Sequence, residues 1–157
     1  MAEFLYAYKR TGGHEGGYSN MKSDKGGETY CGISRKYYPK WVGWEIVDKH
    51  KPLKRGEIIK DTMLANDVRQ FYYREKWQPI GGDAIDNQNI ADFIYDWYVN
   101  SGGALIAVQK ALDLTADGIF GNKTISAINN TENCLQILIE ARTQYVHNIV
   151  AKDPTQL

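Results

Sequence analysis

The chain has 157 residues, enough for one domain with a buried core, and its 43% hydrophobic and 24% charged residues are typical of a globular protein. Lys plus Arg (19) equal Asp plus Glu (19), so the net charge is zero; a nucleic acid is not expected as the main partner, because phosphate binding normally needs a basic surplus. A membrane-spanning helix needs about 20 consecutive apolar residues, and no apolar run in the sequence is nearly that long, so no membrane insertion is expected.

The first predicted element is a short helix over residues 3–15. Phe4 and Tyr8 share one face of this helix, and Glu15 follows Tyr8 by seven residues, so the helical period turns Glu15 toward the apolar face. Two glycines just before the end weaken the last turn, since glycine inside a helix costs about 1 kcal/mol relative to alanine.

The next segment is expected to hold the only β structure. Residues 16–33 are punctuated by glycine, which predicts a small hairpin or a turn-rich β segment. Ser34 is a candidate N-cap for a short helix that Pro39 ends. One or two helical turns are expected near Glu45–His50.

The rest of the chain is predicted to be helical. The segment 88–100 is almost wholly apolar, which indicates a central helix. Apolar periodicity predicts helices over 56–76, 88–100, 103–113, 121–130 and 132–151. The sequence therefore predicts a single, mainly α domain over 1–157: a helical bundle around a central apolar helix, with a small N-terminal β-hairpin.

The strongest candidate for chemistry is the set Glu15, Asp24 and Thr29. Cleavage of a glycosidic bond needs one carboxyl group that keeps its proton for the leaving oxygen, and usually a second group that handles water or the oxocarbenium-like charge. A Glu on an apolar face loses hydration, which raises its pKa, whereas an Asp in a glycine-rich polar loop stays ionised. The alternative for Glu15 is a solvated surface residue at a helix end.

Four stretches of the chain carry motifs in a fixed order: 14–34, with Glu15-Gly16-Gly17-Tyr18, then 73–83, 96–102 and 108–124. Together they resemble glycoside hydrolase family 108. Members of that family are N-acetylmuramidases, and some are described as secretion activators or phage endolysins. The last stretch is similar to the part of the family known as its peptidoglycan-binding half.

The resemblance implies a lysozyme-like α+β fold with Glu15 as the catalytic acid. Asp24 and Thr29 are carried over from the similar phage-lysozyme pattern, a Glu followed by an Asp nine residues on and then a Thr. The resemblance also implies a catalytic half over 1–87 and a helical peptidoglycan-binding-like half over 88–157. The implied reaction is hydrolysis of the β-1,4 bond between N-acetylmuramic acid and N-acetylglucosamine in peptidoglycan glycan strands.

Aromatic and amide side chains are the candidate sugar contacts. Four rings either stack on a sugar face or pack in a core, and these are Tyr18, Tyr30, Trp97 and Tyr98. Asn100 follows the apolar helix, where it either contacts a sugar N-acetyl group or closes the helix end before a pair of glycines.

No metal or organic cofactor is expected. The three His residues form no evident ligand set, and Cys31 and Cys134 match no zinc spacing. The turn 113–118 has part of a calcium-loop pattern, but Thr124 stands where the bidentate Glu of such a loop would be, so a plain turn is expected.

The N-terminus has no signal-peptide pattern. We therefore expect a protein that is made in the cytoplasm and acts on the cell wall or periplasm after export or phage-type release. We also expect a monomer. Two other functions stay open. One is a lytic transglycosylase, which can use one acidic residue without an activated water. The other is a non-catalytic wall-binding or secretion-accessory protein that uses the C-terminal half.

Overall fold

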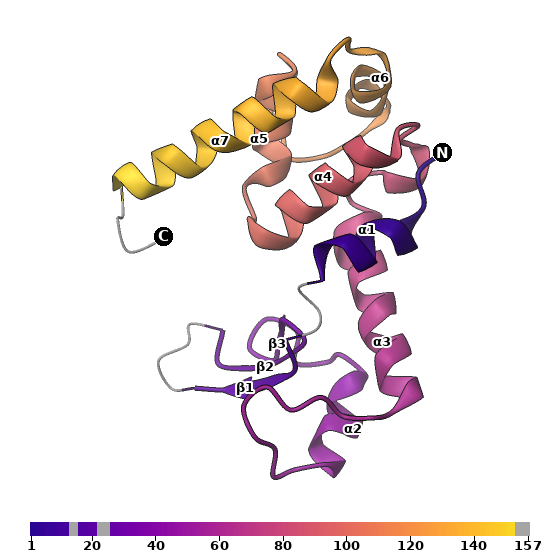
Figure 1. Ribbon diagram of the computed structural model, residues 1–157, viewed down its shortest axis with the longest axis vertical. Coiled ribbons are helices and arrows are strands. Elements are labelled where there is room, and N and C mark those ends of the chain that lie inside the picture. The colour runs from indigo at the N-terminus through magenta and orange to yellow at the C-terminus, as the bar shows by residue number, and fades with distance from the viewer. Residues whose placement is uncertain (13–15, 22–25, 153–157) are drawn as a thin grey trace. The chain divides into compact units, whose positions relative to one another are not determined.

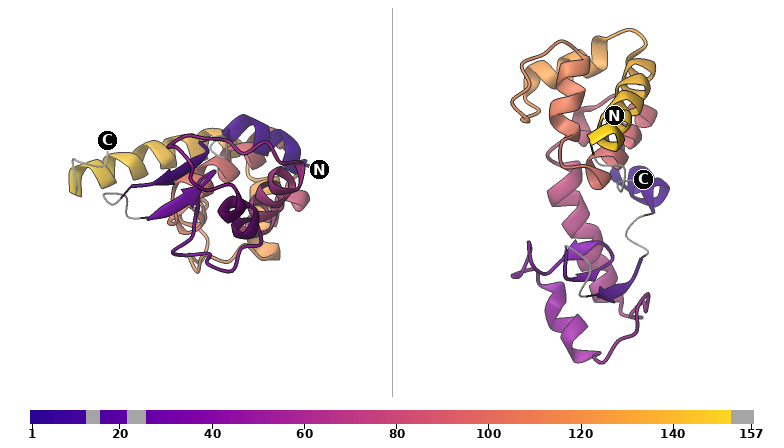
Figure 2. Two further views of the ribbon diagram at one scale, coloured as in Figure 1. Left: turned by 90° about the horizontal axis from the view of Figure 1, so that it is seen from below. Right: turned by 90° about the vertical axis from the view of Figure 1, so that its left-hand side faces the viewer.

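The structure is a computed structural model that describes residues 1–12, 16–21 and 26–152. The described residues form seven α-helices and one three-stranded sheet near the N-terminus (Figures 1 and 2), which confirms the predicted mainly helical α+β fold. In chain order the elements are α1 (Phe4–Thr11), β1 (Tyr18–Asn20), β2 (Glu28–Tyr30), β3 (Ile33–Ser34), α2 (Gly43–Lys49), α3 (Thr62–Tyr72), the π-helix η2 (Tyr73–Trp77), the 3₁₀ turn η3 (Gly82–Ala84), α4 (Gln88–Asn100), α5 (Ala104–Ala111), α6 (Asn122–Asn130) and α7 (Cys134–Lys152).

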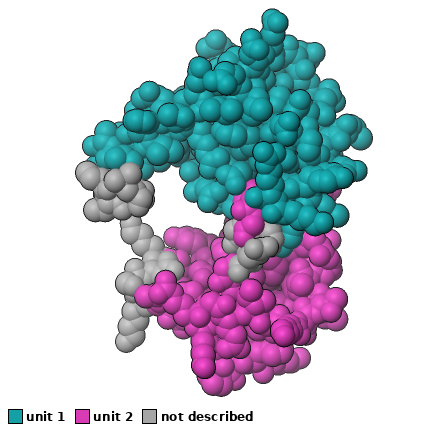
Figure 3. Space-filling model, in the orientation of Figure 1, with its two compact units in different colours: residues 1–10, 74–157 teal, residues 11–73 magenta. Residues whose placement is uncertain are grey.

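The chain forms two compact units (Figure 3). Unit 1 combines Met1–Arg10 with Arg74–Leu157, and unit 2 is Thr11–Tyr73. These units do not coincide with the two halves expected from the resemblance, 1–87 and 88–157. Within the described ranges, no helix combines the length and the apolar character needed to cross a membrane.

Helix α4 is the core helix of unit 1, at the bounds that the sequence predicts. Ala91, Ile94 and Trp97 on this helix are fully buried, and α5 and α7 pack against it and against each other (Figure 1). Asn87 begins the helix as its N-cap, because its side chain accepts a hydrogen bond from the Ile90 N–H at 3.1 Å. The bounds of α4 can be predicted from the sequence because an apolar stripe and an N-cap residue both mark the helix.

The first residues of the chain pack against α4 and against the segment that precedes it. The Ala2 N–H donates to the Ile85 carbonyl at 2.7 Å. The ring of Phe4 on α1 lies 5.8 Å from the Trp77 ring and 5.9 Å from the Tyr95 ring. Unit 1 is therefore built from two separate stretches of chain.

Unit 2 joins a meander sheet to two helices. The strands are antiparallel in the order β1-β2-β3, and α2 packs against α3. Asp61 caps α3 by accepting from the Leu64 N–H at 2.8 Å. The ring of Trp41 packs edge to face against both helices, 5.4 Å from Trp44 on α2 and 6.3 Å from Phe71 on α3.

Three local predictions are wrong. The N-terminal helix ends at Thr11 rather than at residue 15, because Gly12 takes the left-handed conformation at φ 64° that commonly ends a helix. Ser34 is the last residue of β3 and not a helix N-cap, since its hydroxyl donates to the Gly26 carbonyl at 2.7 Å. The helix expected over 56–76 begins only at Thr62, after its Asp61 cap.

Candidate active site

The two proposed catalytic carboxyl groups, those of Glu15 and Asp24, lie outside the described residues. Glu15 belongs to the connection 12–17 between α1 and β1, and Asp24 to the connection 21–27 between β1 and β2. Glu15 would lie on an apolar helix face only if the helix reached residue 15, but α1 ends at Thr11, so the helical period does not place its side chain. The role of Glu15 as the catalytic acid stays a prediction. The structure describes the residues on either side of both connections.

The chain is fixed two residues after Glu15. The Cys31 N–H donates to the Gly17 carbonyl at 2.9 Å. On the next residue, the Tyr18 N–H donates to the Glu57 carbonyl at 2.9 Å, while the Tyr18 carbonyl accepts from the Gly56 N–H at 2.7 Å. The start of β1 is thus bonded to the end of β2 and to the 56–57 backbone.

Gly17 is required at this position for two reasons. Its φ is +69°, a conformation that side chains disfavour, and an added Cβ would lie 2.6 Å from the Gly56 carbonyl oxygen and 2.7 Å from that of Glu57. The backbone of 56–57 therefore approaches a glycine directly. This close approach gives a physical reason for the second glycine of the Glu15-Gly16-Gly17-Tyr18 motif.

Thr29, the third predicted catalytic residue, lies at the centre of the sheet. It stands opposite Ser19 of β1 on one side and Ser34 of β3 on the other. Directly paired residues share a sheet face, so three hydroxyl side chains form a row across one face. Thr29 and Ser19 are half-buried. The bond from Ser34 to the Gly26 carbonyl fixes the chain two residues after Asp24.

The opposite face of the sheet carries a network of charges around Glu28. The Glu28 carboxylate accepts from the Tyr18 hydroxyl at 2.7 Å and is paired with Lys51 at 2.6 Å and Arg35 at 3.2 Å. The guanidinium of Arg35 also makes two bonds to Asp48, at 2.7 and 2.9 Å. Lys51 completes the network with Asp48 at 3.0 Å. No motif or regular spacing in the sequence marks this network.

The network keeps both carboxyl groups ionised. Burial acts to raise the pKa of Glu28, but hydrogen bonds from Lys51, Tyr18 and Arg35 outweigh it and lower that pKa below its ordinary value. Hydrogen bonds from Arg35 and then Lys51 hold the pKa of Asp48 well below its usual range. Glu28 is therefore a fixed negative charge that anchors the sheet, and not a proton donor.

Replacement of Glu28 by Gln is expected to destabilise the protein in a pH-dependent way. Because the folded pKa of Glu28 lies below the unfolded value of about 4.3, its contribution is complete above that pH and is lost as the pH falls through the folded value. We expect a loss of about 1–3 kcal/mol at pH 7. Thermal unfolding of both chains from pH 7 to pH 2.5 measures this, and a difference that does not shrink at low pH would contradict it.

Two of the predicted sugar-stacking rings, Tyr18 and Tyr30, are buried in unit 2. Tyr18 is 7% exposed and donates its hydroxyl to Glu28. Tyr30 is 2% exposed, and its hydroxyl oxygen accepts from the Ile59 N–H at 3.1 Å. Both rings pack within unit 2, so little of either ring surface is exposed for stacking on a sugar.

The other three predicted contacts belong to α4. Trp97 is fully buried against Phe93 and Tyr145, which leaves no ring face for a sugar. Tyr98 is half-buried, with the Lys76 ammonium 4.3 Å from its ring centroid. Asn100 is exposed, and its amide donates to the Asp96 carbonyl at 2.8 Å, one turn back on the same helix.

The metal-binding residue types are dispersed. Within the described part of the chain, His, Cys, Asp and Glu form no group of three or more that is placed to hold a metal ion. Cys31 and Cys134 are both buried free thiols. Burial raises the pKa of each thiol, so neither is activated as a nucleophile.

A comparison with protein-family models matches residues 8–102 to the model described as glycosyl hydrolase 108. The chain belongs to glycosyl hydrolase family 108. The matched segment covers more than half of the chain and includes Glu15, Asp24 and Thr29. Family 108 membership makes the chain a glycosidase whose general activity is hydrolysis of peptidoglycan.

The fold is similar to that of a solved protein. The structure titled "Structure of Brucella abortus SagA" superposes with a TM-score of 0.64 at 22% sequence identity, over 98% of this chain and 87% of that one. At this identity the likeness concerns the fold. A comparison with curated proteins finds no match.

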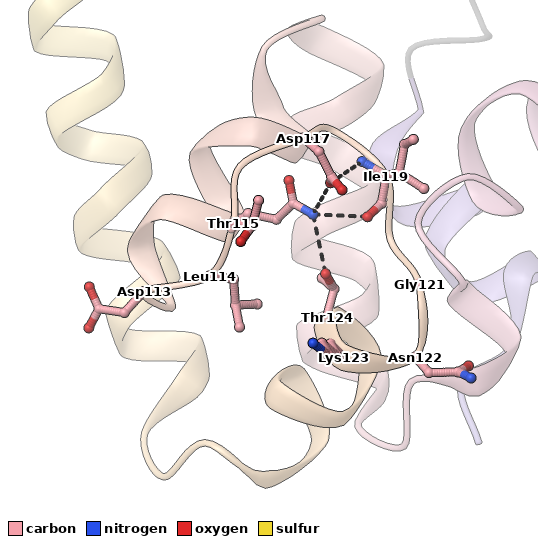
Figure 4. A pocket seen from close by; sticks show the side chains of 10 residues that line it. Asp113, Leu114, Thr115, Asp117, Ile119, Gly121, Asn122, Lys123 and Thr124 are labelled. Carbon is pink, nitrogen blue, oxygen red and sulfur yellow. Dashed lines mark hydrogen bonds between the residues drawn. The ribbon is translucent and has the colours of Figure 1, made fainter.

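A pocket of about 460 Å³ lies in unit 1, outside the segment that matches family 108 (Figure 4). It is formed by the last turn of α5, the loop between α5 and α6, and the start of α6. Its lining includes the carboxylates of Asp113 and Asp117, which belong to the predicted turn 113–118. The lining residues are Gln109, Asp113, Leu114, Thr115, Asp117, Ile119, Gly121, Asn122, Lys123 and Thr124.

One buried amide organises this pocket. Gln109 is 1% exposed, and its amide nitrogen lies 3.0 Å from an Asp117 carboxylate oxygen, 2.9 Å from the Ile119 carbonyl and 3.2 Å from the Thr124 hydroxyl. Its carbonyl oxygen accepts from the Gly118 N–H at 2.8 Å. The loop therefore folds around the side chain of Gln109.

Replacement of Gln109 by Ala is expected to cost about 2–3 kcal/mol, because several loop groups lose their partner at a buried position. Chemical denaturation measures the loss, and hydrogen exchange at the Gly118 amide should accelerate. Gln136, exposed on α7, is the matched control, and its replacement by Ala should change stability by less than about 0.5 kcal/mol. Equal effects of the two substitutions would contradict this role of Gln109.

Proposed function

We propose that the chain is an N-acetylmuramidase that hydrolyses the β-1,4 bond between N-acetylmuramic acid and N-acetylglucosamine, with Glu15 as general acid. The observation that carries the proposal is the family 108 match over 8–102, which contains the whole predicted catalytic set. The bonds at Gly17 and Tyr18 support it, because they fix the chain from the second residue after Glu15 onward. A catalytic acid must be held in place to act.

In the proposed reaction, Glu15 donates its proton to the bridging oxygen as the bond from the sugar anomeric carbon to that oxygen breaks. Asp24, with Thr29, either orients the water that completes hydrolysis or stabilises the developing positive charge. The central position of Thr29 in the sheet supports such a role, because strands hold a side chain more firmly than a loop does.

We propose further that residues 88–157 contribute wall binding within one domain. The pocket around Gln109 supports this, since its lining combines carboxylate, amide and hydroxyl side chains with the apolar Leu114 and Ile119. Of the predicted sugar contacts, half-buried Tyr98 and exposed Asn100 are the most accessible. The site of action is the cell wall or periplasm, reached by export or phage-type release, and we expect a monomer.

Digestion of purified peptidoglycan by the wild-type chain tests the proposal. We expect new reducing ends, with N-acetylmuramic acid at the reducing terminus by mass spectrometry. Anhydro termini would identify a lytic transglycosylase instead. Retention on insoluble peptidoglycan without released sugar would identify a non-catalytic wall-binding or secretion-accessory protein.

A further inference from the structure

The pocket around Gln109 carries charges of both signs. Asp113 and Asp117 contribute carboxylates from the loop, and Lys123 contributes an ammonium from the start of α6 (Figure 4). All three residues are exposed, and none of them takes part in an ion pair with a described residue. A ligand that carries both an ammonium and a carboxylate would find a partner for each charge here.

The Asp117 carboxylate is held in a fixed orientation. One of its oxygens accepts from the Ile119 N–H at 3.0 Å and from the Gln109 amide at 3.0 Å. The same two bonds lower the pKa of Asp117, with the Ile119 N–H as the larger cause. Asp117 is therefore an ionised carboxylate that the loop positions before any ligand arrives.

The Thr124 hydroxyl has a proton to donate into the pocket. Thr124 is 5% exposed and lines the pocket. Its oxygen accepts from the Gln109 amide at 3.2 Å, and no hydrogen bond to a described residue uses its proton. A buried donor without an acceptor costs free energy. A ligand carboxylate beside Thr124 and Lys123 would satisfy the hydroxyl and meet the ammonium of the next residue.

The apolar part of the lining is aliphatic. Leu114 is half-buried and Ile119 is exposed, and both line the pocket. Of the described residues that form the lining, none is aromatic. A methylene chain gains from contact with such side chains, whereas a sugar ring finds no aromatic face to stack on. The lining therefore fits an aliphatic, zwitterionic ligand better than a glycan.

We propose that this pocket binds the peptide part of peptidoglycan, at a diaminopimelate residue whose second amino group is free. The side chain of that residue is a short methylene chain that ends in a carbon bearing an ammonium and a carboxylate. The ammonium pairs with Asp117, and the carboxylate binds the Thr124 hydroxyl and Lys123. The methylene chain lies on Leu114 and Ile119.

This inference rests on the proposed function, which makes the cell wall the target. In cross-linked peptides the second amino group is consumed in an amide bond and has no positive charge. The pocket would therefore select peptides that are not cross-linked.

Two soluble peptides test the proposal on the intact chain. Alanyl-γ-glutamyl-diaminopimelate and alanyl-γ-glutamyl-lysine are titrated separately, and the amide signals of Gly118 and Ile119 are followed by NMR. We expect the diaminopimelate peptide to bind about three- to tenfold more tightly, since lysine lacks the terminal carboxylate and a charge-assisted bond at an exposed site contributes modestly. Acetylation of the terminal amino group should weaken binding by a similar factor.

Substitutions in the pocket assign each charge. Lys123→Met should make the two peptides bind alike. Asp117→Asn should weaken both peptides about three- to tenfold, while its amide oxygen can still accept from Ile119 and Gln109 and keep the loop folded. Asp86, an exposed carboxylate of unit 1 outside the pocket, is the matched control. Asp86→Asn should bind both peptides as the wild-type chain does.

Three results would overturn the proposal: no binding of the diaminopimelate peptide, equal binding of the two peptides to the wild-type chain, or unchanged binding in Asp117→Asn. An oligomer of N-acetylglucosamine serves as the competing ligand. If it shifts the Gly118 and Ile119 signals and the peptides do not, the pocket is a sugar site instead.

The binding measurement separates this proposal from the proposed function, because it needs no hydrolysis. Glu15→Gln should bind the diaminopimelate peptide as the wild-type chain does. A chain that binds this peptide through Asp117 but releases no reducing ends would refute the muramidase and keep the peptide site. A chain that releases reducing ends but does not bind the peptide would do the reverse.

Discussion

Replacement of Glu15 by Gln is expected to reduce the release of reducing ends from purified peptidoglycan by about a hundredfold to ten-thousandfold, the usual contribution of a general acid. The amide of Gln has nearly the same shape as the carboxyl group but cannot transfer a proton to the bridging oxygen. The bonds at Gly17 and Tyr18 do not involve the Glu15 side chain, so the fold should be kept. Reducing-end assays and a zymogram measure the loss.

Glu45 provides the matched control for this experiment. It is an exposed carboxylate in the first turn of α2, in the same unit. Glu45→Gln should digest peptidoglycan at the wild-type rate and melt at nearly the wild-type temperature. If Glu15→Gln also digests peptidoglycan at that rate, Glu15 is not the acid.

Replacement of Gly17 by Ala is expected to cost about 3–5 kcal/mol and to abolish most activity. A side chain at φ +69° is strained by about 1–2 kcal/mol. The new methyl group would also displace the 56–57 carbonyls, and with them the hydrogen bonds that hold Tyr18, at about 1 kcal/mol each. Thermal unfolding should register a fall of about 10 °C or more.

Gly27 separates the two causes of this loss. Its φ is +65°, almost that of Gly17, but an added Cβ would meet nothing within 4 Å. Gly27→Ala should therefore cost only the strain of about 1–2 kcal/mol. If the two substitutions destabilise the chain equally, the close approach of the 56–57 backbone is not what requires Gly17.

Helix positions could be predicted well where an apolar stripe and a capping residue coincide. Residues 88–100 have both, and α4 has the predicted bounds. The end of α1 cannot be predicted from periodicity, because the helical spacing that begins with Phe4 and Tyr8 can be extended past Gly12 and carries no information on the conformation that a glycine takes. The start of α3 cannot be read from the periodicity, because Ile59 lies in a segment without helix or strand before Asp61 yet fits the helical spacing of apolar residues.

The candidate site was only partly predictable for a related reason. Thr29 was placed in a hairpin because glycine spacing is a local signal. The partners of Glu28 are not local. Arg35 reaches it from a turn and Lys51 from a loop, while Asp48 on α2 pairs with both of these cations, and no regular spacing marks such a set. Burial of Trp97 likewise depends on Tyr145, which lies on a helix far along the chain.

The split make-up of unit 1 sets an order for its assembly during translation. Met1–Arg10 leaves the ribosome before its partners, Ile85 and Tyr95, which emerge only after the whole of Thr11–Tyr73. The apolar face of α1 therefore stays exposed to solvent while Thr11–Tyr73 is synthesised. Pausing the ribosome before residue 85 should leave α1 accessible to protease, and release past the end of α4 should protect it.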